Sequence, residues 1–335
     1  MNAFIVIGVA ALVLLMQFLV TPNIPQHLLL RFSFDTELAE PSEKIVCNGK
    51  LTNNWFLPVI YMCLYEHIPE GAVVSGKKDN KLSHRIFLFP HSSFKHKVYF
   101  TLPKRGIYRS GKYYVETGDF LGFNSKVLSG RINANLVVMP KRCEDAQVLN
   151  VLGGYLGDIS VRRFILEDPV LTMGYLDYTG REPMKKISWK HSAKVGKLMV
   201  KNSDYTVDAN AAVVLNMDTG SAKEKEKSFE IVRSVCEQLE QKQIPYEFLS
   251  NGDAGNLKEG YGKKHMDQLM TNLGRSGLCG FSSFDKLVER CIRGQKKNRS
   301  FFIISPPLSP KDKQALARLQ SVSEYELCVL EAEVD

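Results

Sequence analysis

The hydrophobic pattern changes character twice along the chain, and its first part is one unbroken apolar run. Residues 3–20 read AFIVIGVAALVLLMQFLV, with Gln17 as the one polar side chain. As a helix this run rises about 27 Å, close to the roughly 30 Å hydrocarbon core of a bilayer. The basic region and small-residue cleavage site of a signal peptide are missing. We therefore predict a retained transmembrane helix at 3–20, with a cleaved signal peptide as the alternative.

Short runs rich in β-branched and aromatic residues follow, from about residue 28 to residue 140. They are LLLRFSF, KIVCNGKLT, PVIYMCLYE, RIFLF, HKVYFTL, KYYVET and ANLVVM, and Gly, Pro and Asn clusters separate them. Polar and apolar residues alternate over 97–102, as in a strand with one buried face. The spacing predicts an immunoglobulin-like β-sandwich over 28–140, with a polar loop at 73–83.

From about residue 202 the pattern becomes that of an α/β domain. AAVVLNM fits a strand buried on both faces, and apolar residues recur at helical spacing in EKSFEIVRSVCEQLEQK. The alternation continues through YEFLS, FDKLVERCIR, SFFIIS, PKDKQALARLQ and YELCVLE. Ser309 before Pro310 marks the start of one of these helices. Alternating strands and helices predict a doubly wound sheet over 202–335.

The distribution of charge and the cysteine content indicate in which cellular compartment the soluble part of the chain lies. The formal net charge is +8, and no charged side chain precedes the apolar run, whereas Arg31, Lys44 and Lys50 follow it. The positive-inside rule then favours a cytoplasmic body. The seven cysteines are odd in number, widely spaced and without a CxxC pair, which indicates free thiols in a reducing compartment. Hydrophobic content of 44% is ordinary for a globular protein, so neither disorder nor a polytopic membrane protein is indicated.

The stretch 160–201 carries much of the excess positive charge. Nine Lys or Arg residues stand against four acids there, a local balance of +5. These cations could be a solvated face, a contact with anionic lipid, or a docking surface for an acidic protein. Nucleic acid is disfavoured because few aromatic residues are interleaved with the charges. Trp189 is predicted to anchor a core with Ile187 and Leu198, and an exposed interface residue is the alternative.

Part of the same stretch resembles a family signature. Residues 178–194 read YTGREPMKKISWKHSAK, and GKLMV follows at 196–200. This segment resembles the signature of the bacterial "domain of unknown function fifty-eight" family, membrane proteins commonly encoded beside MoxR-type AAA+ ATPases. Two further stretches, KRGIY at 104–108 and GDFLGF at 118–123, look like the family's Arg-Gly-x-Tyr segment and the turn that follows it. The residues that carry the resemblance are Lys186, Ile187, Trp189, Lys190, Ser192, Ala193, Lys194, Arg105, Gly106 and Tyr108.

The resemblance implies a domain order and a role. The order is a β-sandwich, the signature within a basic connector at 141–201, and a von Willebrand factor A-like α/β domain at 202–335. Relatives usually carry two membrane spans, whereas one is predicted here. The implied role is that of a membrane-anchored, non-catalytic scaffold or adaptor that cooperates with a MoxR-type AAA+ ATPase in protein assembly or maturation. No cofactor is expected.

The A-like resemblance also raises a metal-dependent alternative. Intact A-type domains place Asp-x-Ser-x-Ser after the first strand and coordinate Mg²⁺ through hard oxygen ligands. The matching residues here run from Asp218 to Ala222, so Asp218 is kept while Gly220 and Ala222 replace the two serines. A Mg²⁺-dependent protein- or ligand-binding module using Asp218 is therefore the alternative function. The role of a cap for the following helix or turn is favoured for Asp218.

No catalytic motif stands out in the sequence. GxSxG, HExxH and Walker A patterns do not occur. His191 and Ser192 are adjacent, but neighbouring residues rarely face each other and no orienting acid is evident. The other histidines are scattered along the chain, and the glycine-rich segment 153–157 is predicted to be a flexible connector. We therefore expect a protein that is not an enzyme.

Overall fold

The computed structural model forms two compact units, the first comprising residues 1–141 with 273–275 and the second residues 142–272 with 276–335. It describes residues 5, 7–9, 11, 21–74, 81–109, 111–119, 125–131, 135–165, 172–180, 182–203, 210–296 and 298–334. Most of the predicted span at 3–20 lies outside these residues. Within the described part of the chain, no helix is both long and apolar enough to cross a membrane.

The first unit is a β-sandwich, as predicted, and a short 3₁₀ helix, η1 (Thr21–His27), precedes it. One sheet has the strand order β1 (Leu28–Phe34), β3 (Lys44–Asn53), β7 (Ser93–Thr101) and β5 (Val73–Val74). The other has the order β10 (Ser125–Arg131), β9 (Lys112–Gly118), β4 (Val59–His67) and β6 (Lys81–Leu88). A small third sheet joins β2 (Leu38–Ala39), β11 (Asn135–Val138) and β8 (Gly106–Arg109). All seven predicted runs form strands. The predicted polar loop at 73–83 is wrong at both ends, because residues 73–74 form β5 and residues 81–83 begin β6, and residues 75–80 lie outside the description.

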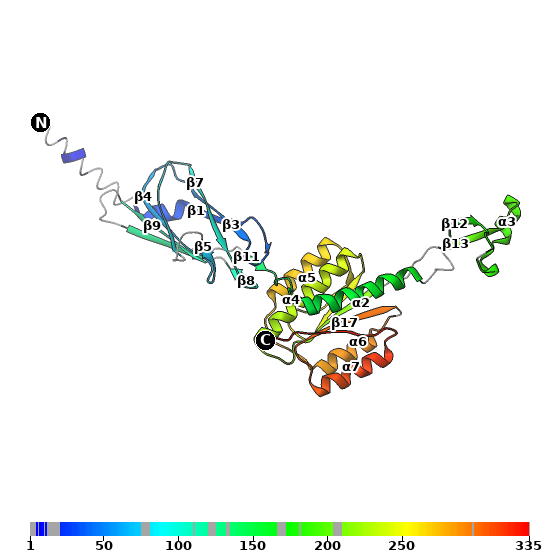
Figure 1. Ribbon diagram of the computed structural model, residues 1–335. Coiled ribbons are helices and arrows are strands. Elements are labelled where there is room, and N and C mark those ends of the chain that lie inside the picture. The colour runs from blue at the N-terminus through cyan, green and yellow to red at the C-terminus, as the bar shows by residue number, and fades with distance from the viewer. Residues whose placement is uncertain are drawn as a thin grey trace. The chain divides into compact units, whose positions relative to one another are not determined.

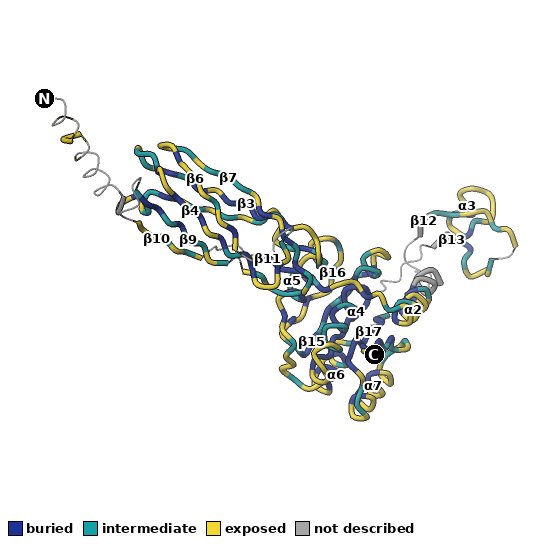
Figure 2. Tube along the Cα trace, turned by 60° about the vertical axis from the view of Figure 1, so that its left-hand side comes forward, coloured by how far each residue is buried: buried dark blue, intermediate teal, exposed yellow. Residues whose placement is uncertain are grey.

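The strands of the sandwich alternate between a buried and an exposed face, which Figure 2 shows as alternating colours. In β6, Leu82, Ile86 and Leu88 are buried, whereas Ser83, Arg85 and Phe87 are exposed. The buried side chains of the two sheets meet in two separate apolar clusters. One contains Ile45, Cys47, Ile68, Leu82, Val98 and Phe100, and the other contains Leu28, Leu51, Met62, Leu64, Ile86 and Val115.

The second unit is built on a five-stranded sheet. Its order is β16 (Leu257–Gly260), β15 (Tyr246–Ser250), β14 (Asn210–Leu215), β17 (Arg299–Ser305) and β18 (Cys328–Glu331). Neighbouring strands are parallel except for β16, which pairs antiparallel with β15. β14 and β17 are buried along nearly their whole length, because helices cover both faces. The predicted doubly wound arrangement is therefore present.

Helices α4 (Ala222–Gln241), α5 (Lys263–Arg275) and α2 (Ala146–Ile165) cover one face of this sheet, and α6 (Phe284–Arg293) and α7 (Pro310–Val322) cover the other (Figure 1). The predicted apolar stripe of α4 is fully buried. Ser309 begins α7 with a capping box, because its hydroxyl accepts from the Asp312 N–H and the Asp312 carboxylate accepts from the Ser309 N–H.

Helix α2 contradicts the prediction of a flexible connector at 153–157. Val148, Leu152, Leu156 and Ile159 recur at helical spacing and are all buried. The glycines between them cost the helix about 1 kcal/mol each relative to alanine. Burial of four large apolar side chains outweighs that cost, at about 1.5–3 kcal/mol for each side chain. The sequence of glycines alone was therefore a poor guide to this segment.

The family signature folds as a small module. β12 (Thr172–Asp177) pairs antiparallel with β13 (Met199–Ser203), and between them lie η2 (Met184–Lys186) and α3 (Trp189–Val195). α3 ends at Gly196, whose φ of 74° is the left-handed conformation that glycine adopts without strain.

The seven cysteines are free thiols, and six of them are buried. Burial raises the pKa of Cys291 and Cys328 to about 12. These thiols therefore stay protonated at neutral pH and pack as small apolar groups.

Candidate functional site

The carboxyl ends of β14, β15 and β17 meet at one edge of the α/β sheet, where open sheets of this kind bind ligands. Asn216 and Asn251 directly follow β14 and β15, and Ser305 ends β17. All three side chains are buried. Asn216 Nδ2 donates to Ser305 Oγ at 3.0 Å, and Asn251 Nδ2 donates to Asn216 Oδ1 at 2.9 Å. The strand ends are thus tied to one another by side-chain amides.

The rest of the hydrogen bonds at this edge go to backbone groups. Asn251 Oδ1 accepts from the Met217 N–H at 2.6 Å, and Asn251 Nδ2 also donates to the Ser282 carbonyl at 3.0 Å. Asn216 Oδ1 accepts from the Asp218 N–H at 3.0 Å. In both amides the oxygen accepts, and the NH₂ group donates, hydrogen bonds within the protein itself. We call these side chains and their backbone partners the amide network.

Asp218 acts as a cap, but for a different helix from the one predicted. Its Oδ2 accepts from the Phe284 N–H at 3.2 Å, at the first turn of α6. A carboxylate is favourable at this position because the helix end exposes unpaired N–H groups. The helix that follows Asp218 in the chain, α4, is capped by Ser221 and Glu224 in a capping box.

The loop after Asp218 explains why serine is absent at the next ligand position. Gly220 has φ of 96°, and a Cβ built on it would lie 2.4 Å from the Cβ of Pro306. A serine there would be both strained and in collision with the proline ring. The buried oxygens beside the Asp218 carboxylate, those of Asn216, Asn251 and Ser305, each accept a hydrogen bond within the protein, and the carboxylate itself accepts one from the backbone. This donor set does not fit Mg²⁺, which requires near-octahedral oxygen coordination.

We predict that restoring the serines will not create a magnesium site. The double substitution Gly220→Ser with Ala222→Ser is expected to show no saturable Mg²⁺ binding by titration calorimetry. It should also lower the free energy of unfolding by roughly 1–3 kcal/mol, because of the strained φ. Ala222→Ser alone is the control and should change stability by no more than about 0.5 kcal/mol, since that position is exposed. Saturable binding that disappears with Asp218→Ala would contradict this expectation.

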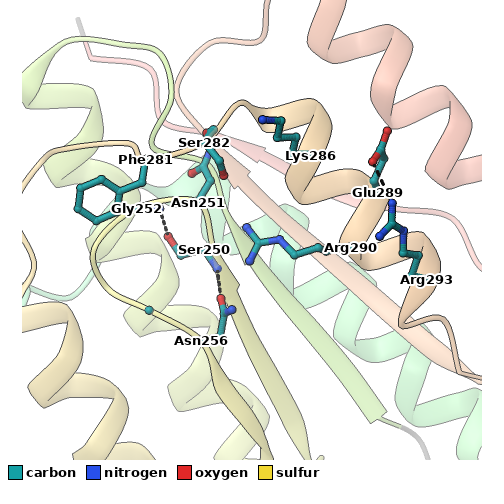
Figure 3. A pocket seen from close by; sticks show the side chains of 11 residues that line it. Ser250, Asn251, Gly252, Asn256, Phe281, Ser282, Lys286, Glu289, Arg290 and Arg293 are labelled. Atoms are coloured by element: carbon teal, nitrogen blue, oxygen red, sulfur yellow. Dashed lines mark hydrogen bonds and ion pairs between the residues drawn. The ribbon is translucent and has the colours of Figure 1, made fainter.

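A cleft of about 620 Å³ opens beside the amide network. Ser250, Asn251 and Ser282 lie at its inner end, and Arg290 reaches toward them from α6 (Figure 3). Lys286 comes from the same helix, whereas Arg293 pairs with Glu289 at 3.5 Å. Within the part of the chain that the structure describes, Lys286 and Arg290 make no ion pair. The cleft is therefore positive, and its chemistry suits an acidic side chain or another anionic group.

The signature residues divide into those that build their module and those that it exposes. Ile187 and Val200 are buried and form a β-bridge, and Ser192 Oγ accepts from the Met199 N–H at 2.8 Å. Trp189, in contrast, is 62% exposed, and Leu198 is also exposed. The prediction of a core anchor at Trp189 is therefore wrong. A seven-residue helix against a two-stranded ribbon offers too little surface to cover an indole.

The cationic signature residues lie at or near the surface of the module. Lys190, Ala193 and Lys194 are exposed, and Lys186 is half-buried. His191 does not pair with Ser192. Its ring stacks on Tyr175 instead, with 3.6 Å between ring centroids. The hydrolase-like pairing of adjacent His and Ser that the sequence raised is thus absent from the described geometry.

The Arg-Gly-x-Tyr segment belongs to the first unit and has a structural role. Arg105 directly precedes β8, and Gly106 begins the strand with φ of 153°. Tyr108 is half-buried against an apolar cluster and donates its hydroxyl to the Lys104 carbonyl at 2.8 Å. Burial raises the pKa of Tyr108. The turn that follows at 118–123 is described only for its first two residues.

Three residues that sequence reasoning missed come together inside the sandwich. Glu66, His84 and His96 each offer one ligand atom, and these atoms lie within 4.8 Å of one another. The sequence showed only scattered histidines. The available signal was that each of the three falls in phase with the buried residues of its own strand.

Comparison with known proteins assigns no family. No family model and no curated protein matches the chain. Among solved structures, the crystal structure of the CARDB domain of a Pyrococcus furiosus protein, in complex with di-metal ions, is 10% identical. The match covers 33% of this chain and 94% of the CARDB chain, with a TM-score of 0.21. A solution structure of the same domain gives the same values. A Pseudomonas fluorescens alkylpurine DNA glycosylase, AlkC, bound to DNA with an abasic site analogue, is also 10% identical, covering 33% and 30% with a TM-score of 0.19. These likenesses carry no functional assignment.

Proposed function

We propose that this protein is a membrane-anchored, non-catalytic scaffold or adaptor that binds a protein partner through the β12–β13 module. By resemblance, the partner is a MoxR-type AAA+ ATPase engaged in assembly or maturation of other proteins. One observation carries the proposal. The module buries Ile187 and Val200 at 6% and 5% exposure, yet it leaves the Trp189 side chain 62% exposed. An exposed tryptophan is unfavourable in water, and it is among the residues most enriched at interface hot spots.

The surroundings of Trp189 indicate the chemistry of the partner. Other large apolar side chains of the module are also exposed, namely Leu176, Met184, Val195 and Leu198. Exposed lysines accompany them at positions 185, 190, 194, 197 and 201. Apolar anchors supply binding energy once they enter a pocket, and surrounding cations speed the encounter with an acidic surface. This combination favours an acidic protein with an apolar pocket.

The second unit supports the A-like part of the proposal. Asp218 lies at the carboxyl end of β14, the strand at the centre of the sheet and its first in chain order. That is the position of the metal-binding aspartate in A-type domains, which this chain resembles with two of the serines replaced. In our proposal the domain binds without a metal, and the cleft with Lys286 and Arg290 is a second contact surface. The apolar run at 3–20 provides the membrane anchor.

Affinity capture from native membranes tests the proposal. The full chain, solubilised in mild detergent, is expected to enrich a MoxR-type AAA+ ATPase identified by mass spectrometry. Trp189→Ala should reduce the captured amount at least about tenfold, since truncation of an interface tryptophan commonly removes 2 kcal/mol or more of binding free energy. Tyr261→Ala is the matched control, because Tyr261 is 60% exposed and lies outside both the module and the cleft. Failure of the unmodified chain to enrich such an ATPase, or equal capture by Trp189→Ala, would refute the proposal.

A further inference from the structure

Three ionisable side chains lie at one level in the core of the β-sandwich, and we call them the ionisable layer. Glu66 on β4, His84 on β6 and His96 on β7 converge between the two sheets. Glu66 Oε1 lies 2.5 Å from His96 Nε2, and these two side chains are only 5% and 7% exposed. The imidazole rings of His84 and His96 have centroids 4.9 Å apart. The three side chains therefore share one buried space.

The layer separates the two apolar clusters of the sandwich. Along β6, Leu82 belongs to one cluster and Ile86 to the other, with His84 between them. Along β4, Leu64 and Ile68 belong to different clusters, with Glu66 between them. His96 stands in the same way between Phe94 and Val98 on β7. Three strands from two sheets thus replace an apolar residue by an ionisable one at the same level of the core.

Hydrogen bonds within the protein do not account for this arrangement. Within the described residues, buried Glu66 Oε1 and both ring nitrogens of His96 have no hydrogen bond of acceptable geometry, the Glu66–His96 contact being an ion pair by distance alone. Aromatic rings surround the imidazole, with Phe94 stacked on His96 at 5.4 Å and Phe32 edge-on at 6.2 Å. A buried ion pair offsets the cost of removing its charges from water only when its geometry is good and its remaining polar atoms are hydrogen-bonded or bound to a metal.

The backbone makes room for the His96 ring. Gly49 on β3 lies directly opposite His96 in the β3–β7 register. A Cβ built on Gly49 would lie 2.1 Å from His96 Cε1, so the ring fills the space that any other side chain would need. The position of the imidazole in the core is therefore set by a glycine on the neighbouring strand.

We propose that Glu66, His84 and His96 form a binding site for a divalent transition-metal ion of the Zn²⁺ type. Two imidazole nitrogens and one carboxylate oxygen are a ligand set that suits Zn²⁺, with water as a fourth ligand. Mg²⁺ and Ca²⁺ need several oxygen ligands and do not match it. A bound cation offsets the buried carboxylate charge and uses the ring nitrogens as ligands.

Calorimetric titration of the full chain in detergent, stripped of metal by a chelator, tests the site. The expected result is one Zn²⁺ per chain, a rise in the melting temperature of the sandwich, and no binding of Mg²⁺. Glu66→Gln and His96→Gln should each lower the Zn²⁺ affinity at least tenfold. Gly49→Ala should lower it as well, because it displaces the His96 ring. His67→Gln is the matched control, since His67 follows Glu66 on β4 but its ring meets Tyr114 edge-on, outside the cluster.

Spectroscopy on the unmodified chain keeps the proposal testable if the variants fail to fold. X-ray absorption of the Zn²⁺-loaded protein should show nitrogen and oxygen neighbours with the multiple-scattering pattern of imidazole. Absence of Zn²⁺ binding by the unmodified chain would overturn the proposal. So would binding that persists in folded Glu66→Gln and His96→Gln, or a spectrum with a sulfur ligand, which would point to Cys47 nearby. The site belongs to the sandwich, so its failure would leave the proposed partner-binding function unaffected.

Discussion

Replacing Arg299 by alanine is expected to lower the free energy of unfolding of the second unit by about 3–5 kcal/mol. Arg299 begins β17 and is 1% exposed. Its guanidinium reaches past β14 and lies 2.8 Å from Glu247 Oε2 on β15 and 3.4 Å from Glu259 Oε2 on β16. It also donates to Asn210 Oδ1 and to the Gly294 carbonyl. Truncation leaves the Glu247 carboxylate, Asn210 Oδ1 and the Gly294 carbonyl without this donor, and Glu259 keeps its ion pair with Lys296.

Urea unfolding followed by circular dichroism at 222 nm measures this effect, because most helices of the described chain lie in the second unit. Arg293→Ala is the control. Arg293 is 80% exposed and makes one ion pair, so its loss should change stability by no more than about 1 kcal/mol. Arg299→Lys should fall between the two, since an ammonium keeps the charge but cannot reproduce the guanidinium fork. Equal effects for Arg299→Ala and Arg293→Ala would show that the buried network does not stabilise the unit.

The periodic parts of the fold were predictable from the sequence. Strands with clear alternation, such as β7, and helices with a full apolar stripe, such as α4, were found because burial of that face outweighs local propensity. β10 and β16 were missed, since SKVLSGR and LKEG contain few apolar residues and are strands only through pairing with their neighbours. α2 was missed for the opposite reason, because its glycines concealed a buried stripe.

The candidate sites were predictable only in part. The sequence placed Asp218 after the first strand of the sheet, but the contact of Pro306 with Gly220 is a tertiary one that no local pattern reveals. Likewise, strand periodicity shows that Glu66, His84 and His96 each point inward. It does not show that β4, β6 and β7 present them at one level, because that depends on sheet order. The prediction that Trp189 is buried failed for a related reason. The sequence of a short segment does not indicate how much of the rest of the protein will pack over a side chain.

Replacing Asn251 by leucine is expected to cost the second unit about 2–4 kcal/mol. The change keeps side-chain bulk but leaves the Met217 N–H and the Ser282 carbonyl buried without their partner, and each such loss costs roughly 1–3 kcal/mol. Asn150→Leu is the control, because Asn150 is exposed on α2 and lies outside the amide network. The same urea titration measures both variants. A near-zero effect for Asn251→Leu would mean that the amide network does not hold the strand ends together.

Asn251→Asp turns the same position into a test of metal binding. The introduced carboxyl group would face Asn216 Oδ1 and the Ser282 carbonyl, two acceptors to which the amide now donates. Only the protonated form can donate a hydrogen bond there, so the pKa of the introduced group should be raised in the folded state. The folded state then binds the proton more tightly than the unfolded chain. The loss of stability should therefore be small at low pH and should grow as the pH rises through the raised pKa.

A cation at the strand ends would reverse this trend by favouring the ionised form. No recovery of stability at neutral pH is expected on addition of Mg²⁺. Recovery would show that this edge of the sheet holds a cation once a second carboxylate joins Asp218.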